Sequence, residues 1–158
     1  MSTRSTISIV TNSLIVNGVE EGVPVYKTIY CHFDGYPYDD RGVGNILLRH
    51  FTDKEKVESI IEHGDMSSIG EKIDPDGINP HSFKERQENV CTFYHRDRGD
   101  DWKLCKPRET EDVTEFEKNT DQAYNYLFKD GKWFIKPGWG DTDRDWIELE
   151  FEDRGYLD

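Results

Sequence analysis

The sequence predicts an α+β fold, in which an antiparallel sheet of about five to seven strands carries a helical pair packed on one face. Two observations lead to this prediction. Short segments rich in β-branched and aromatic residues recur between turn signals. Two segments with helical spacing, about residues 43–51 and 54–63, follow one another in the first half of the chain. We expect residues 1–158 to form a single α+β domain, with a strongly acidic part at about residues 138–158.

The N-terminal third predicts strands. Residues 6–10 and 13–16 have the composition of two short strands, and Asn17-Gly18 is a strong turn signal. Residues 23–33 are again β-rich, so the three segments fit an antiparallel meander. The next segment, DGYPYDDRGVG at residues 34–44, has the composition of a loop.

The helical pair is predicted from its spacing and its ends. Apolar residues recur at i, i+3 and i+4 in the first segment, beginning at Val43. Thr52 and Glu55 match a capping box ahead of the second segment, and Gly64 is suited to end it.

The remaining elements are expected from composition and alternation. Residues 65–83 resemble a long loop, and residues 89–97 resemble a strand with RDRGDD as its turn. Residues 109–118 fit a short acidic helix, and residues 123–136 fit a hairpin. Residues 145–153, DWIELEFED, alternate strictly and predict the last strand.

Charge is the most unusual property of the composition. The chain has 33 acidic and 20 basic residues, a formal net charge of −13. Residues 1–50 contribute −1, residues 51–108 contribute −3 and residues 109–158 contribute −9. Such a balance repels nucleic acids and anionic membranes and favours cationic partners.

Targeting signals and disulfides are not expected. No apolar run approaches the roughly 18 residues that cross a bilayer, and the first ten residues lack the apolar core of a signal peptide. Cys31, Cys91 and Cys105 are odd in number and widely spaced, which favours reduced thiols. The sequence therefore predicts a soluble, cytoplasmic protein.

The stretch IYCHFDGYP at residues 29–37 contains a dense group of side chains that could act in catalysis or metal binding. A zinc site is disfavoured because Cys31 and His32 are adjacent and no second Cys/His pair stands nearby. A Cys31–His95 nucleophilic pair has no support from spacing. His32 and Asp34 would share a strand face and form a general-base pair. The favoured interpretation is structural: a buried Cys31 followed by a turn.

The RDRG segment at residues 96–99 is a second conspicuous cluster. Its alternating charges fit an ion-paired turn, and less well a phosphate or carboxylate site. A combined ligand pocket requires both clusters to meet at one end of the sheet. Its candidate residues are His32, Asp34, Tyr36, His95, Arg96 and Arg98. No phosphate-binding loop or metalloprotease motif occurs, and neither a metal nor a cofactor is expected.

The acidic C-terminal segment offers a different kind of site. Alternation in residues 145–153 puts Ile147, Leu149 and Phe151 on one strand face and the glutamates on the other. One interpretation is a solvated edge strand whose charges prevent aggregation. A second is a row of charge that imitates a nucleic-acid backbone and binds a basic protein. Its candidate residues are Asp141, Asp143, Asp145, Glu148, Glu150, Glu152 and Asp153. Metal binding by the carboxylates is a weaker third, because one flat row does not converge on an ion.

Four segments together resemble a widespread family of small phage and prophage proteins of unknown function. They are STRSTISI, IYCHFDGYP, GVGNILLRHFTDKEKVESIIEHGDMSSIG and FYHRDRGDDW. The family shows a Y-C-H-[WF]-D-G-Y box and an R-D-R-G turn, and the resemblance covers roughly Ser2 to Trp102, with a looser part from Tyr124 to Trp133. The chain departs from it at Phe33, where Trp is usual, and at His63, where an apolar residue is usual. The resemblance implies a phage accessory gene and no catalytic residues.

These observations lead to one main functional hypothesis. We expect a non-enzymatic phage-type accessory protein that inhibits or modulates a basic, nucleic-acid-binding host protein through an acidic, DNA-mimic-like surface. Such a partner would be a defence nuclease, a restriction or CRISPR effector, or a polymerase. The alternatives are a small nucleotide- or phosphate-binding enzyme that uses the His32/Asp34 and Arg96/Arg98 clusters, and a virion or scaffold component. The sequence leaves the oligomeric state open.

Overall fold

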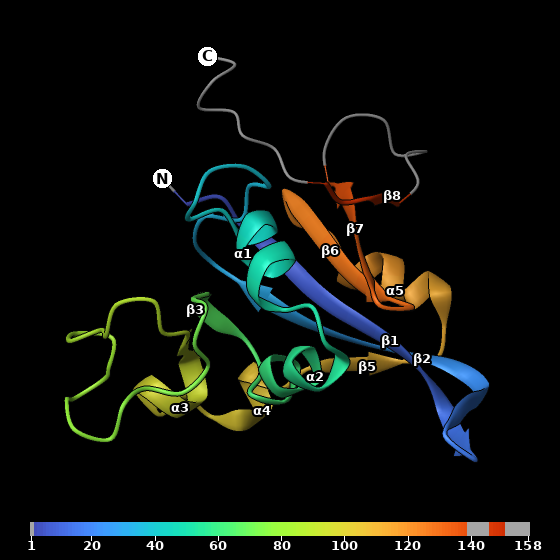
Figure 1. Cartoon of the computed structure of the whole chain (residues 1–158), viewed down its shortest axis with the longest axis horizontal. Coiled ribbons are helices and arrows are strands. Elements are labelled where there is room, and N and C mark those ends of the chain that lie inside the picture. The colour runs from blue at the N-terminus through green and yellow to red at the C-terminus, as the bar shows by residue number, and fades with distance from the viewer. Residues whose placement is uncertain (1, 139–145, 151–158) are drawn as a thin grey trace.

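A mixed sheet forms the centre of the protein (Figure 1). The computed structural model describes residues 2–138 and 146–150. Within these ranges the sheet has eight strands in the order β4-β3-β2-β1-β6-β7-β8, with β5 pairing β2. The strands are β1 (Ser5–Val16), β2 (Val19–Cys31), β3 (Met66–Ser68), β4 (Thr92–Phe93), β5 (Arg108–Thr110), β6 (Tyr124–Lys129), β7 (Lys132–Pro137) and β8 (Ile147–Glu148).

Five short helices accompany the sheet in the same described ranges. They are α1 (Val43–His50), α2 (Lys54–Glu62), α3 (Tyr94–Arg98), α4 (Trp102–Cys105) and α5 (Val113–Asn119). The α+β class and the helical pair α1–α2 are confirmed. None of the helices in this part of the chain is long and apolar enough to span a bilayer.

The prediction of an antiparallel sheet is wrong for two pairs of neighbouring strands. β2 pairs with β3 in parallel, and β1 pairs with β6 in parallel. The first parallel pair follows from the connection, because α1 and α2 cross over between β2 and β3 and return the chain in the same direction. The second pair joins strands separated by most of the chain, and no sequence pattern predicts that pairing.

Several element boundaries also differ from the prediction. Residues 5–16 form one continuous strand, because Thr11 and Asn12 pair with β2 like their neighbours. The strand predicted at residues 89–97 is only two residues long, and the chain turns into α3 at Tyr94. The predicted loop at residues 65–83 contains β3. The Asn17-Gly18 turn is confirmed by positive φ angles of 52° and 78°.

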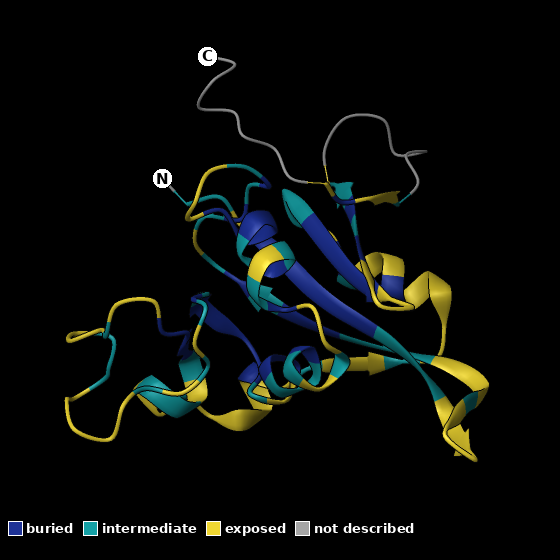
Figure 2. Ribbon diagram, in the orientation of Figure 1, coloured by how far each residue is buried: buried dark blue, intermediate teal, exposed yellow. Residues whose placement is uncertain are grey.

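The hydrophobic core lies between the sheet and the α1–α2 pair, as the dark ribbon in Figure 2 shows. Every second residue in the buried halves of β1 and β2 faces this layer. Ile7, Ile9 and Ile29 are among them, and each is at most 2% exposed. On β6 and β7 the same layer contains Tyr126 and Trp133. The opposite sheet face carries Tyr26 and Leu127 and is covered by α5.

β1 and β2 continue beyond the sheet as a projecting hairpin. β6 pairs with β1 only as far as Ile9, and β5 pairs with β2 only at residues 26–28. Residues 10–24 therefore form a two-stranded extension, which we call the hairpin arm (Figure 1). Most of its residues are exposed, in contrast to the buried halves of the same strands (Figure 2).

Candidate functional site

The IYCHFDGYP segment is held by local hydrogen bonds. The His32 Nδ1 lies 2.6 Å from the Tyr30 hydroxyl, and the Tyr36 hydroxyl donates to the Asp34 carboxylate at 3.2 Å. The predicted His32–Asp34 pair therefore does not form, since each side chain bonds to a tyrosine. Partial burial, with a smaller effect of Arg4, lowers the pKa of His32.

The loop that follows is packed too tightly for side chains at its glycines. A Cβ on Gly35 would lie 2.8 Å from the Thr3 carbonyl oxygen, and one on Gly44 would lie 2.7 Å from the Pro37 Cα. From β6, the Tyr126 hydroxyl donates to the Gly35 carbonyl at 2.6 Å. This arrangement supports the structural interpretation of the motif, as a turn docked against the sheet.

Cys31 is not placed for nucleophilic chemistry. Its side chain is fully buried, and burial raises the pKa of the thiol to about 12. The Cys31–His95 pair considered from the sequence is therefore unsuited to catalysis, because a thiolate is the reactive form. His95 instead donates from Nδ1 to the Asp100 carbonyl at 2.8 Å.

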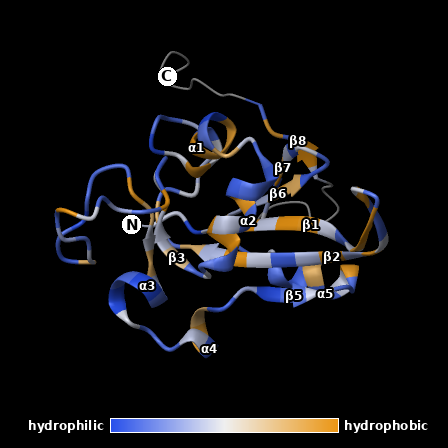
Figure 3. Cartoon of the chain, turned by 60° about the horizontal axis from the view of Figure 1, so that its bottom comes forward, coloured by the Kyte–Doolittle hydropathy of each residue, from blue (hydrophilic) through white to orange (hydrophobic). Residues whose placement is uncertain are grey.

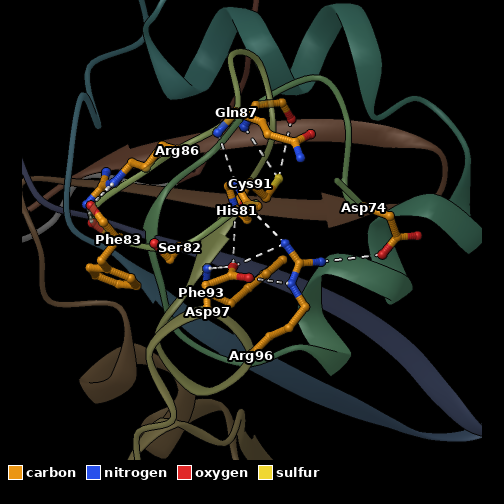
Figure 4. Close-up of polar contacts among 12 residues, drawn as sticks. Asp74, His81, Ser82, Phe83, Arg86, Gln87, Cys91, Phe93, Arg96 and Asp97 are labelled. Atoms are coloured by element: carbon orange, nitrogen blue, oxygen red, sulfur yellow. Dashed lines mark hydrogen bonds and ion pairs between the residues drawn. The ribbon is translucent and has the colours of Figure 1, made fainter. Parts of the chain in front are cut away.

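The RDRG segment forms an ion-paired cluster, shown in Figure 4. Asp97, whose side chain is 4% exposed, accepts two bonds from Arg96, at 2.9 and 3.1 Å, and one from the Phe93 backbone N–H at 2.7 Å. Arg96 also donates to the carbonyls of Ile73 and Cys91, at 2.8 and 2.9 Å. The guanidinium is thus occupied by the protein itself, so it is not available to a phosphate.

His81 is a buried member of this cluster that sequence reasoning missed. Its Nδ1 accepts from the Gln87 N–H at 3.0 Å, and its Nε2 donates to the Cys91 carbonyl at 3.1 Å (Figure 4). The Asp97 carboxylate lies 3.6 Å from Nε2. With both ring nitrogens bonded to backbone and the side chain 1% exposed, His81 fixes the long loop to α3. An isolated histidine in a turn-rich segment gives no sequence signal for this role.

Arg98 has a separate partner. It forms a bidentate pair with Asp100, both distances being 2.8 Å, and its guanidinium lies over the Phe83 and Tyr94 rings. The side chain is about half exposed. The ion-paired interpretation of RDRG thus fits the geometry, with Arg96 and Arg98 bound to different carboxylates.

The register of the sheet separates the two sequence motifs. Cys31 pairs with Met66 in parallel, and Met66 pairs with Phe93 in antiparallel orientation. The chain therefore leaves β2 toward one end of the strands and leaves β4 toward the opposite end. The two motifs thus continue in opposite directions from the row of Cys31, Met66 and Phe93, which does not support the prediction that both lie at one sheet end. Of the six candidate residues, only Asp34 lines the cavity described next.

Asp34 does line a cavity of about 280 Å³ between its loop, α1 and the end of β3. The cavity is polar and carries both signs of charge. Some of its charged groups pair with each other, including His50 with Glu71 at 3.4 Å. The Thr92 hydroxyl at its lining is buried and has no hydrogen-bond partner in the described structure. This mixture of charges does not select one class of ligand.

Only part of the predicted acidic row can be placed. Asp141, Asp143, Asp145, Glu152 and Asp153 lie outside the described residues. Glu148 and Glu150 are exposed, and Glu148 lies 3.3 Å from Lys132. The uniform apolar face expected in this strand is not formed, since Leu149 is 6% exposed and Ile147 is 62% exposed. Ile147 belongs to a two-residue strand at the border of the sheet.

An aromatic hollow lies next to these glutamates, on the sheet face covered by α5. Phe116 of α5 stacks on Tyr26 at 4.2 Å between ring centroids and on Trp146 at 5.7 Å. The hollow has a volume of about 400 Å³, and Phe134 and Leu127 of the hairpin β6–β7 also line it. Glu117, Lys129 and Asp130 contribute charged groups to its lining. No pattern in the sequence indicates that these aromatic rings converge.

Exposed acidic side chains lie around this hollow and along α5. We call them the acidic surface: Glu111, Asp112, Glu115, Glu117, Asp121, Asp130, Glu148 and Glu150. The Phe116–Trp146 contact joins α5 to the segment that enters β8, so acidic elements about 30 residues apart in sequence are brought together. Lys118, Lys129 and Lys132 interrupt the surface.

Comparison of the chain with protein-family models, with curated proteins and with solved structures yielded no match. The resemblance to phage proteins therefore stays a prediction. Functional assignment rests on the geometry of the chain alone.

Proposed function

We propose that this protein is a non-enzymatic accessory protein that binds and modulates a basic, nucleic-acid-binding protein of a host cell through its acidic surface. The observation that carries the proposal is the Phe116–Trp146 stack, which brings the acidic residues of α5 and β8 to one aromatic hollow. Exposed carboxylates attract a basic protein, and partly exposed rings give it apolar area to bury.

The composition supports the same kind of partner. The final 50 residues hold a net charge of −9 of the chain's −13, so a basic protein would be steered to this end. Nucleic acid itself would be repelled. The predicted row from Asp141 to Asp153 adds five further carboxylates close in sequence to Glu148 and Glu150.

The alternative of a phosphate- or nucleotide-binding enzyme has less support. Arg96 and Arg98 are both paired with carboxylates, and His32 and Asp34 bond to tyrosines. An anion would have to displace these protein contacts before binding, at the cost of leaving a buried charge without its partner.

Affinity capture from host lysate, with washes at low and high salt, tests the proposal. We expect a basic nuclease or polymerase subunit to be retained at low salt and lost at high salt, because charge pairs at an interface rim are screened. Glu115→Lys with Glu117→Lys should reduce capture strongly, and so should Asp141→Lys with Asp143→Lys and Asp145→Lys.

Two glutamates elsewhere provide a matched control. Glu55 and Glu62 are exposed on α2, which lies on the other face of the sheet. Glu55→Lys with Glu62→Lys changes the net charge as much as the α5 variant does, and it should leave capture intact. Equal loss of capture in the α5 and α2 variants would mean that only the overall charge of the protein matters. Unchanged capture in all variants would contradict the proposal.

A further inference from the structure

The outer edges of the hairpin arm have no strand partner within the described residues. β6 leaves β1 after Ile9, so the backbone groups on that side of residues 10–16 face solvent. A free edge of this length is a template for another strand. Proteins usually protect such edges with charge, proline or a short length.

The two edges of the arm differ in this protection. The β2 edge contains Glu20, Glu21 and Pro24, and a proline cannot donate to a new ladder. The β1 edge, with the sequence VTNSLIV at residues 10–16, has no charged residue and no proline. The less protected edge is therefore that of β1, whose one irregularity is a bulge between Asn12 and Leu14.

The arm is also apolar where it is exposed. Leu14 is 58% exposed, Ile15 67%, Val16 44% and Val19 59%. Figure 3 shows hydrophobic segments at this projecting end of β1 and β2. Leu14 and Val16 share one face of the strand and Ile15 lies on the other, so apolar side chains stand on both faces.

We propose that the β1 edge of the hairpin arm pairs in antiparallel orientation with the same edge of a second copy of this chain. The absence of charge on this edge favours a second copy of the chain as the partner. The edge is uncharged, so two copies meet there without like charges opposite each other, although the chain as a whole has a net charge of −13. Two-fold pairing of residues 10–16 would complete the backbone ladder, put Val10 of each copy opposite Val16 of the other, and cover part of the exposed apolar side chains.

The expected dimer is weak and depends on salt. Seven paired residues span about 24 Å, and one strand pair buries less than the roughly 1,600 Å² of a standard interface. Two molecules of net charge −13 also repel each other, and salt screens that repulsion. Dimerisation should therefore strengthen as salt is raised, whereas the proposed capture of a basic partner weakens.

Analytical ultracentrifugation over a range of protein concentrations tests the proposal, at low and at moderate salt. Wild-type protein should show a concentration-dependent dimer. Leu14→Lys and Ile15→Lys should each raise the dimer dissociation constant by about tenfold or more, because each introduces like charges across the two-fold axis. Both positions are exposed, so the fold should persist in a circular dichroism spectrum.

Leu104→Lys is the matched control, since Leu104 is 79% exposed on α4 and outside the arm. It should dimerise like the wild type. A wild type that remains monomeric at every concentration would overturn the proposal, and so would equal dissociation in all three variants. The wild type could instead be monomeric and capture a host protein that Leu14→Lys no longer captures. That result would overturn the dimer and show that the arm pairs with a strand of another protein. Because the arm and the acidic surface share no residue, either proposal can fail without the other.

Discussion

Arg96 and Arg98 are two residues apart in sequence and sit in opposite environments. Arg96 holds a carboxylate that is 4% exposed and also binds two backbone carbonyls, whereas the Arg98–Asp100 pair is largely solvated. The sequence predicted ion pairing for RDRG but not which arginine is structural. That distinction depends on the loop that contains His81, which folds over Asp97 from outside the motif.

We predict that Arg96→Ala lowers the free energy of unfolding by about 3 kcal/mol, because it leaves the Asp97 charge buried without its partner. Arg98→Ala should cost much less, because an exposed ion pair contributes little to stability. Urea denaturation of both variants measures the difference. Equal losses would mean that the Arg96 network does not hold the loop.

Asp65 makes the stability of the protein depend on pH. Burial raises the pKa of this carboxyl, although the Tyr30 N–H donates to it at 2.9 Å and Arg108 lies 3.6 Å away. The folded protein therefore binds a proton more tightly than the unfolded chain, whose value is near the ordinary 3.8. The stability that this group contributes is highest below pH 3.8. It falls as the pH rises from 3.8 through the pKa of Asp65 in the folded protein.

We expect Asp65→Asn to remove this dependence. The amide oxygen still accepts from the Tyr30 N–H, and no charge has to be buried. The stability of the variant relative to wild type should grow as pH rises across the window above 3.8 and then stay constant. Urea denaturation at a series of pH values measures it, and a difference that does not change with pH would contradict the assignment.

At the scale of elements, the start of α2 shows how a correct pattern can assign the wrong residue. The capping box predicts Thr52 as the N-cap, but the cap is Asp53, whose carboxylate accepts from the Lys56 N–H at 2.8 Å. Both residues are suitable N-caps by type. The choice is made by where α1 ends, since Phe51 is already its C-cap and fully buried.

Asp53→Ala should therefore destabilise the protein by about 1 kcal/mol, the usual effect of losing an N-cap. Thr52→Ala should change stability by less than about 0.5 kcal/mol, as for a surface position without such a role. Thermal and urea unfolding of the two variants compare them directly. A larger loss of stability for Thr52→Ala than for Asp53→Ala would mean that Thr52 is the N-cap, as the capping box predicts.

Prediction of the elements succeeded where a segment defines itself. The hairpin around Asp130-Gly131 has its own turn and alternation, and the helices α1 and α2 have their own periodicity. β3 and β4 are two or three residues long and exist only because neighbouring strands pair with them. The sequence therefore indicated no strand at β3 and a much longer one at β4, and local pattern likewise does not reveal the convergence of Tyr26, Phe116 and Trp146.

At the scale of the whole molecule, charge and apolar surface are segregated. The acidic surface lies on α5 and β8, and the uncharged edge lies at the projecting end of β1. Composition indicated acidity in the last third of the sequence, but the predicted row lies mostly outside the described residues and did not include α5. Composition did not predict the uncharged edge, since residues 10–16 look like an ordinary buried strand until the topology leaves their outer side without a neighbour.

The parallel pairing of β1 with β6 also bears on how the chain is made. Ser5 pairs with Tyr124, so β1 receives its central neighbour only after about 120 further residues have been synthesised. At about 5 to 20 residues per second, the wait is roughly 6 to 24 seconds. During that interval the nascent chain exposes an uncharged strand on which a chaperone can act, and any product truncated before residue 124 keeps that strand without its neighbour.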